Sequence, residues 1–155
     1  MAAEVCDEVH DEVHDIVDDQ LRRTRQRYTR GRRQLVELLL AVGRPVTIQE
    51  LLEEGAAQSQ SSLYRNLAIL EQCGAVERIA STDDVARYEL TEELSEHHHH
   101  LVCALCGRIE DVVFPATVER ALAAAAQEAT EQRGFVVSSH RIELVGTCRS
   151  CTAAG

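Results

Sequence analysis

The stretch His97-His98-His99-His100-Leu101-Val102-Cys103-Ala104-Leu105-Cys106-Gly107 places four imidazoles directly before a Cys-x-x-Cys pair. A second pair, Cys148 and Cys151, lies near the end of the sequence. Four thiolates in two such pairs are the usual donor set of a tetrahedral structural zinc site. We therefore predict that the four cysteines bind one structural Zn²⁺ and tie the last residues to this stretch.

The four histidines are not needed by that zinc site. In a strand, successive side chains point to opposite faces. His98 and His100 are thus expected on one face, and His97 and His99 on the other. One short strand then supplies ligands to two further metal sites, a pattern that favours a metal-sensing protein. The alternative is a solvated surface strand.

Length and composition bound the class of protein. With 155 residues, the chain is one large domain or two small ones. It has no run of eighteen apolar residues, so no membrane span is predicted. Residues 1–20 are acidic, unlike a secretory signal, which favours a cytoplasmic location. In that reducing compartment, we interpret paired cysteines as metal ligands in preference to disulfides.

The net charge of −10 argues at first against a nucleic-acid partner, but the charges are sorted along the chain. Residues 1–20 contain eight acidic residues and no basic one, whereas residues 22–33 contain seven arginines and no acidic one. Arginine suits contacts to phosphate and guanine. We therefore expect this run, Arg32 included, to lie against DNA phosphates. The alternative is a solvated helix face that balances the acidic residues.

Residues 1–20 form a separate acidic segment with the tandem Asp-Glu-Val-His at 7–10 and 11–14. Its four-residue period keeps Val9, Val13 and Val17 near one helical stripe. We interpret the segment as a solvated or frayed N-terminal arm. The alternative is a weak metal site, because Cys6, His10 and His14 are spaced at i, i+4 and i+8.

Residues 21–91 show the element order of a winged helix-turn-helix domain. An apolar helical pattern over 35–42 ends at Gly43, and a capping box over 47–50 opens a short helix to about residue 54. A second helix runs from about residue 61 to Gly74, and the segments 76–80 and 85–90 alternate as a hairpin.

The helix that begins near Ser61 is in the position of a recognition helix. The first residues of such a helix reach base edges, and arginine pairs well with guanine. Hydroxyls and free amides at a helix start hold phosphate. The residues that we expect to contact DNA are Ser61, Ser62, Tyr64, Arg65 and Asn66.

The remaining residues predict a hinge over 92–97 and a small α/β domain over 98–155. Strands are expected at 98–103 and 108–113, around the first cysteine pair. Thr117 is expected to cap an alanine-rich helix that ends near Arg133, followed by strands at 135–137 and 141–145. The predicted fold class is α+β, with a winged helix-turn-helix domain before this α/β domain and its four-cysteine zinc site.

Three blocks of this sequence resemble the ferric uptake regulator (Fur) superfamily. They are residues 28–32, with Thr-x-x-Arg; residues 62–76, with Tyr64 and Arg65; and residues 97–107 with the second cysteine pair. The resemblance covers about residues 21–151. It implies a metal-dependent repressor that dimerises through its C-terminal half. Metal would then draw two winged helices into register on a palindromic operator in double-stranded DNA.

The resemblance also implies ligands beyond the structural zinc. A regulatory site near the hinge is expected from His98, His100, Glu89, Glu77 and Asp111. A further site in the dimerisation domain is expected from His97, His99, His140 and Glu119, although His140 also fits a structural histidine.

Two positions depart from the family pattern. Arg44-Pro45 stands where many iron-type members have a histidine, and Thr91 stands where zinc-type members often have a cysteine. The remaining nitrogen and oxygen donors suit Zn²⁺, Fe²⁺ or Mn²⁺ without choosing between them. We expect a zinc- or iron-type member, with Zn²⁺ or Fe²⁺ as the second divalent metal ahead of Mn²⁺ or Ni²⁺.

Three alternative functions fit parts of the sequence. A peroxide sensor would share this fold, whereas a metal buffer or chaperone would not explain the arginine run. A zinc deaminase is disfavoured, because four cysteines leave no open zinc position and Val102 replaces the proline of that motif. We therefore do not expect an enzyme.

Overall fold

The computed structural model describes residues 2–81 and 83–153, with side chains from residue 10 onward. The chain divides into two units, residues 1–96 and 97–155. No helix among the described residues is long and apolar enough to cross a membrane.

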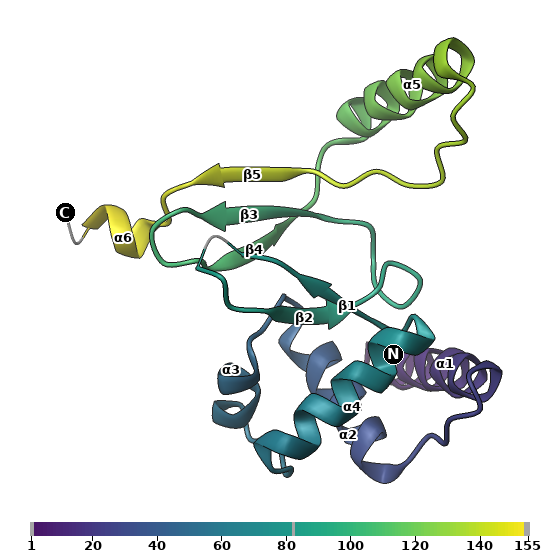
Figure 1. Cartoon of the computed structure of the whole chain (residues 1–155), viewed down its shortest axis with the longest axis vertical. Helices are drawn as coiled ribbons and strands as arrows, with labels where there is room; N and C mark the ends of the chain where they lie inside the picture. Colours follow the sequence, from purple (N-terminus) through teal and green to yellow (C-terminus); the bar gives the residue numbers. More distant parts are fainter. Residues whose placement is uncertain (1, 82, 154–155) are drawn as a thin grey trace. The chain divides into compact units, whose positions relative to one another are not determined.

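The first unit contains helices followed by a hairpin (Figure 1). Its elements are α1 (Ala2–Arg23), α2 (Arg30–Val42), α3 (Ile48–Glu53), α4 (Gln60–Cys73), β1 (Val76–Ile79) and β2 (Arg87–Leu90). The α2–α4 helices and the antiparallel β1–β2 hairpin are the predicted winged helix-turn-helix, with α4 as the recognition helix.

Local sequence signals set the helix ends in this unit. Thr47 and Glu50 form the predicted capping box: the Thr47 hydroxyl accepts from the Glu50 N–H, and the Glu50 carboxylate accepts from the Thr47 N–H. Ser59, in the polar stretch before α4, caps this helix, and Gly74 ends it at φ 86°. The left-handed backbone conformation at this position favours glycine, which has no Cβ atom.

The core of the first unit is formed by leucines and valines from every helix. Leu35 and Leu39 of α2, Leu51 of α3, and Leu63 and Leu67 of α4 are all less than 4% exposed. Burial of one such side chain contributes about 1.5–3 kcal/mol. The recognition helix is therefore held on one face by a packed apolar core.

The structure corrects the interpretation of the N-terminal segment. Val13, Val17 and Leu21 of α1 are buried in the same core, so the described part of this segment is not a solvated or frayed arm. The acidic residues misled the interpretation, because they occupy the outer face of an amphipathic helix while the valine stripe faces inward.

The turn of the β1–β2 hairpin is held by an ion pair. Arg87 of β2 is buried, and its guanidinium donates to both carboxylate oxygens of Asp83, at 2.8 and 2.9 Å. This pairing holds the pKa of Asp83 far below its usual range.

The second unit is built on a sheet of order β4-β3-β5 (Figure 1). Its elements are β3 (His99–Cys103), β4 (Ile109–Val112), α5 (Ala116–Arg133), β5 (Glu143–Gly146) and α6 (Arg149–Ala153). The central strand β3 pairs antiparallel with β4 and parallel with β5. Together the two units confirm the predicted fold class.

Two local predictions in this unit are wrong. Thr117 does not cap α5: the N-cap is Pro115, which makes no side-chain cap and accepts the first N–H groups through its carbonyl. Residues 135–137 form no strand, and Phe135 and Val136 are 70% and 85% exposed. A short apolar segment becomes a strand only when a neighbouring strand pairs with it, and pairing with β3 begins at Glu143.

Candidate metal centres and nucleic-acid interface

The four cysteines converge at one end of the sheet. Cys103 ends β3, and Cys106 follows in a turn closed by Gly107 at φ 69°. Cys148 directly precedes α6, and Cys151 lies within it. The four sulfur atoms all lie within 4.8 Å of one another. Parallel pairing of Cys103 with Gly146 of β5 brings the second pair to the first.

The sulfur spacing fits a metal rather than a disulfide. The Sγ atoms of Cys106 and Cys148 are 3.8 Å apart. Tetrahedral Zn–S bonds place two sulfurs about 3.8 Å apart, whereas a disulfide needs about 2.05 Å.

The pKa values of the cysteines in this cluster also favour a bound cation. The N–H of Cys148 donates to the sulfur of Cys103 and, with neighbouring amides, lowers its pKa to about 6. A hydrogen bond to Cys106 retains the proton of Cys151 and raises its pKa. Four thiolates this close need a positive charge to ionise together, and a bound divalent cation would provide it.

A second cluster gathers three imidazoles around one carboxylate. Nε2 of His99 lies 3.0 Å from Glu119 Oε1, and Nε2 of His97 and of His140 lie 3.4 and 3.3 Å from Glu119 Oε2. These residues come from β3 and the residues before it, the first turn of α5, and the segment before β5. Phe114 packs against the buried His99 ring, with ring centroids 4.4 Å apart.

The charge state of Glu119 is suited to a cation. Desolvation raises the pKa of Glu119, but its hydrogen bond with His99 and the charges of His99 and His97 outweigh this, so the pKa lies below its usual value. Nitrogen and carboxylate donors within 4.8 Å of one another fit a divalent transition metal.

The third cluster lies on the opposite side of β3. His98 and His100 have ring centroids 5.2 Å apart, and Asp111 of β4 is the register partner of His100. Nε2 of His98 lies 3.8 Å from Asp111 Oδ2. The expected alternation of the histidine tetrad is thus present, with one pair on each face of the strand.

The other two residues expected at the regulatory site belong to the first unit. Glu77 of β1 and Glu89 of β2 are register partners across the wing hairpin. Arg44, at the position of the missing family histidine, pairs its guanidinium with Glu50 at 2.9 Å.

The arm metal site does not form from the described side chains. The side chain of Cys6 lies outside the described residues, and His10 is exposed. His14 is buried, with Nδ1 2.5 Å from the Tyr28 hydroxyl and Nε2 3.6 Å from Glu37. His14 therefore anchors α1 to α2 and to the segment that precedes α2.

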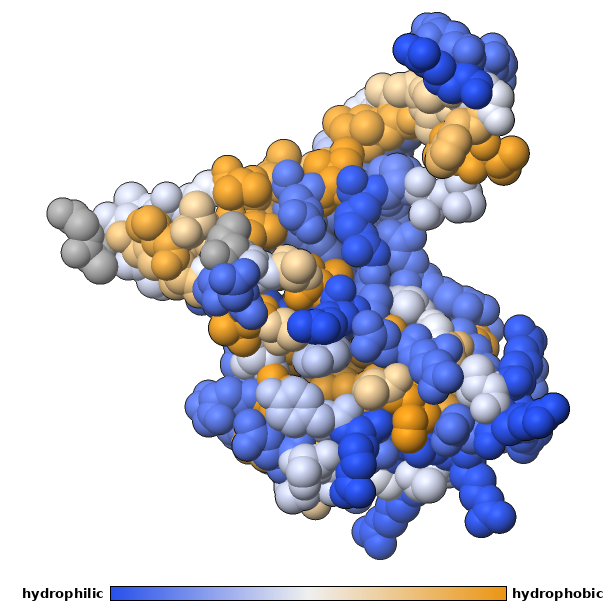
Figure 2. All heavy atoms as spheres, viewed as in Figure 1, coloured by the Kyte–Doolittle hydropathy of each residue, from blue (hydrophilic) through white to orange (hydrophobic). Residues whose placement is uncertain are grey.

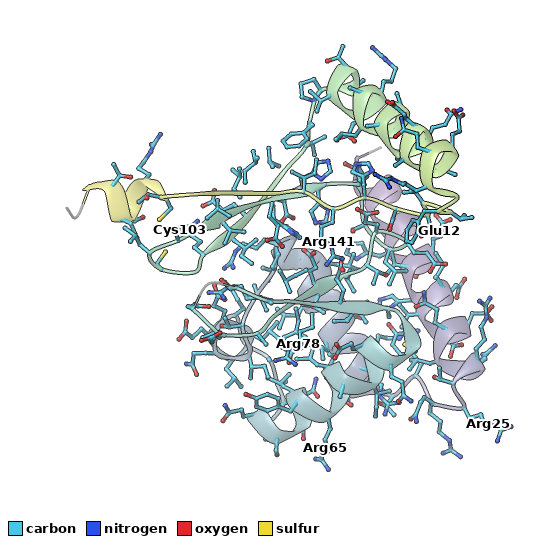
Figure 3. The ribbon with its side chains drawn as sticks, turned by 45° about the horizontal axis from the view of Figure 1, so that its top comes forward. Glu12, Arg25, Arg65, Arg78, Cys103 and Arg141 are labelled. Atoms are coloured by element: carbon cyan, nitrogen blue, oxygen red, sulfur yellow. The ribbon has the colours of Figure 1, made fainter. Side chains whose placement is uncertain are left out.

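The recognition helix presents the expected polar face. Tyr64 is 53% exposed, and Ser61 and Arg65 are also exposed, while Ser62 is half-buried. The Arg65 guanidinium rests on the first turn, donating to the Ser61 carbonyl and the Ser62 hydroxyl at 3.3 Å each. Figure 3 shows Arg65 and Arg25 pointing outward at the lower edge of the first unit.

Two predicted DNA contacts are engaged within the protein instead. Arg32 is 8% exposed and donates to the Arg27 carbonyl, so it faces inward rather than toward a phosphate. Asn66 is half-buried and donates to Gln58. Sequence reasoning missed Gln58, because its role depends on a contact across 27 residues with Gly31.

A winged helix joined to a sheet unit rich in metal donors defines a class of metal-responsive DNA-binding proteins. The model of the ferric uptake regulator family matches residues 20–145. The chain therefore belongs to the ferric uptake regulator family, whose members are metal-dependent transcriptional repressors, and the predicted resemblance is confirmed.

Individual relatives agree with this assignment. The chain is 31% identical over 105 residues to a ferric uptake regulation protein of Neisseria meningitidis, covering 68% of each chain. It is 27% identical over 139 residues to a peroxide-responsive repressor of Staphylococcus epidermidis, covering 87% of each. The fold resembles that of the Helicobacter pylori ferric uptake regulator, with a TM-score of 0.69, 21% identity, and coverage of 92% and 93%; that protein has three functional metal binding sites.

Proposed function

We propose that this protein is a cytoplasmic repressor that binds a palindromic operator as a homodimer when a regulatory metal links its two units. The observation that carries the proposal is the presence of two nitrogen and oxygen donor clusters on opposite faces of β3, in a chain with an exposed recognition helix. We do not propose an enzymatic activity.

The cysteine cluster has a structural role in this proposal. Cys103 ends β3 and Cys106 lies in the turn after it, whereas Cys148 directly precedes α6 and Cys151 lies within it. A Zn²⁺ ion would balance the thiolates and contribute its binding free energy to folding. The cluster leaves no open position for substrate, consistent with a purely structural ion.

The His98, His100 and Asp111 cluster is the proposed regulatory site. Glu89, at the end of the wing, is the proposed fourth donor, with Glu77 as the alternative from the neighbouring strand. The boundary between the units lies at residues 96 and 97. A ligand from each unit would make DNA binding depend on the metal. Metal and DNA then raise each other's affinity equally, typically by about 1–3 kcal/mol.

The His97, His99, His140 and Glu119 cluster is the proposed second divalent site. Its donors join α5 and the segment before β5 to the central strand. The structure resembles that of a protein with three functional metal binding sites, and three donor clusters are found among the described residues here.

The exposed apolar surface of the second unit supports the proposed homodimer. Leu101 and its register partner Leu144, on adjacent strands, are 39% and 47% exposed. Figure 2 shows apolar side chains gathered over the sheet and over the chain that leads from α5 to β5. A second copy would remove this surface from water.

DNA contact is proposed for Tyr64 and Arg65, supported by Ser61 and Ser62 at the start of α4. Exposed arginines from the run, Arg25, Arg27 and Arg30, are proposed to contact phosphates. Arg22 and Arg23 form ion pairs with Asp18 and Asp19 one turn earlier on α1. These pairs reduce the positive charge that the two arginines present to DNA phosphates.

The proposed regulatory metal is Zn²⁺ or Fe²⁺, ahead of Mn²⁺ and Ni²⁺. The test is operator binding during titration with each of these ions, with metal content measured in parallel. Equal binding by the fully loaded protein and by protein that retains only the cysteine-held ion would refute metal control.

The similarity to a peroxide-responsive repressor supports one alternative within the same fold. A peroxide sensor loaded with Fe²⁺ would gain the mass of oxygen on His98 or His100 after peroxide treatment. Unchanged histidines, together with metal-dependent binding, would leave metal sensing as the function. Metal binding without any DNA binding would instead favour a buffer or chaperone.

A further inference from the structure

Gln58 connects two surfaces of the first unit that face DNA in the proposed function. It lies in the turn between α3 and α4 and is half-buried. Its Nε2 donates to the Gly31 carbonyl in the first turn of α2, at 2.7 Å. Its Oε1 accepts from Asn66 Nδ2 in the second turn of α4, at 2.6 Å.

The direction of these two hydrogen bonds is fixed by chemistry. The Gly31 carbonyl can only accept, so Gln58 must present its NH2 group there. That leaves the Gln58 oxygen for Asn66, which must donate. Both amides therefore have one satisfied orientation, and neither can be replaced by a carboxylate without losing a donor.

The backbone at Gly31 is shaped around this chain of bonds. A Cβ atom at residue 31 would lie 3.3 Å from Gln58 Oε1 and 3.5 Å from Asn66 Nδ2. The first distance is tighter than most real Cβ contacts, so the flexible end of Gln58 would have to move. Glycine at this position lets the two side chains approach α2.

The connected surfaces have different tasks in DNA recognition. The first turn of α2 lies in the arginine run and carries the exposed Arg30 and Arg33. The first two turns of α4 carry Tyr64 and Arg65. Phosphate contacts set the register of a protein on DNA, whereas base contacts give specificity. A fixed link between α2 and α4 lets the phosphate contacts from α2 and the base contacts from α4 form at the same time.

We propose that Gln58 and Asn66 are positioning residues for DNA binding, which lock the recognition helix to the start of α2 so that base and phosphate contacts form together. This inference rests on the proposed DNA-binding function. It replaces the expected role of Asn66 as a direct DNA contact.

The experiment uses the full-length, metal-loaded protein and two probes. One is a duplex enriched by the wild-type protein from a random-sequence library, and the other is a scrambled duplex of the same composition. The measured quantity is the ratio of the two affinities. If the wild-type protein enriches no duplex, the proposed DNA binding fails, and this inference fails with it.

Gln58→Met and Asn66→Leu remove the hydrogen bonds while retaining similar volume. Each variant is expected to lower the affinity ratio by about tenfold, since one connecting hydrogen bond is lost. Binding to the scrambled duplex should change little. The double variant should be no worse than either single variant, because both changes break one chain of bonds. The control is Gln127→Met, which removes an exposed side-chain hydrogen bond, from the Gln127 amide to the Glu131 carboxylate on α5.

Gly31→Ala separates positioning from stability. Alanine favours a helix over glycine, so the unfolding midpoint should stay unchanged or rise. The added Cβ should nevertheless displace Gln58 and lower the affinity ratio. A purely structural role cannot produce a more stable protein with poorer discrimination.

Two results would overturn the inference. In the first, Asn66→Leu changes the preferred base at one position while Gln58→Met and Gly31→Ala leave the ratio unchanged, which would make Asn66 a direct reader. In the second, all variants lower affinity for both duplexes equally and reduce the unfolding midpoint, which would make the link only structural.

Discussion

The two units of this protein are stabilised in different ways. The first unit buries apolar side chains from each of its helices around Leu35, Leu63 and Leu67. In the second unit, the buried apolar residues among those described are Val102, Cys103 and Ile109. None of the residues of α5, all of which are described, is buried. We therefore expect the second unit to depend on metal ligation and a partner for the stability that the first unit obtains from its own core.

The largest expected effect is the loss of structure in the second unit when the proposed zinc ligands are removed. Cys148→Ser with Cys151→Ser should unfold residues 97–155 and leave the helices of the first unit formed, because structural zinc contributes about 10 kcal/mol to small domains. Hydrogen exchange read by mass spectrometry should show lost protection in the second unit only. Cys73→Ser, on the last turn of α4, is the control. Unchanged protection in the second unit would refute this contrast.

The next effect compares one leucine from each unit. Leu67→Ala should lower the unfolding free energy of the first unit by about 2–5 kcal/mol, because it opens a cavity in a packed core. Leu144→Ala should barely change unfolding, since Leu144 is 47% exposed, but should weaken dimerisation about tenfold. Denaturant titration and sedimentation measure the two quantities. A large unfolding effect at Leu144 would show that the sheet has a core of its own.

The third effect tests the dependence of DNA binding on the third cluster. His98→Ala with His100→Ala should abolish metal-stimulated operator binding, a loss of about 5–150-fold, in a folded protein that retains its zinc. Metal analysis and gel shift measure both properties. The exposed His10 provides the matched histidine-to-alanine control. A normal metal response in the double variant would place the regulatory site elsewhere.

The recognition helix provides a smaller test, confined to the first unit. Arg65→Ala should weaken operator binding about tenfold, the usual range for one arginine that contacts a base. Metal content and dimerisation should stay the same. Arg120→Ala, on α5, serves as the charge-matched control. Equal operator affinity in the wild type and the Arg65 variant would exclude the chosen helix face.

The smallest expected effect is a pH dependence of the stability of the first unit. Burial, the largest influence, lowers the pKa of His14; Arg33 and His10 act in the same direction, and Glu37 and Asp11 oppose them. The unfolded chain then binds the proton more tightly, so stability should fall as pH decreases below the ordinary value of about 6.5. His14→Gln should remove this dependence in denaturant titrations across that range. An increase in the stability of the wild-type protein at lower pH would contradict this prediction.

Features set by neighbouring residues were predicted well from the sequence. The Thr47–Glu50 capping box, the glycine that ends α4 and the paired cysteines each depend on residues a few positions apart. The opposite faces of the histidine tetrad follow from strand geometry alone. These features gave the fold class and the composition of the donor clusters.

Features set by distant contacts were not predicted. The docking of α1 was obscured by its acidic face, although its valine stripe was visible in the sequence. The bond from Gln58 to Gly31 and the inward turn of Arg32 depend on helix packing, which spacing does not reveal. Residues 135–137 have strand-like composition but pair with no described strand.

The histidine tract has a consequence for tolerance to insertion and deletion. Because four identical residues occupy consecutive positions, a shift of one residue along the central strand would still leave histidines at three of the four ligand positions. Such a tract cannot by itself define its own alignment with the neighbouring strands. The sulfur-bearing turn that follows fixes the alignment, because Cys103 must meet the end of the chain at one point only. A residue inserted between His100 and Cys103 should therefore be far more harmful than one inserted within the tract.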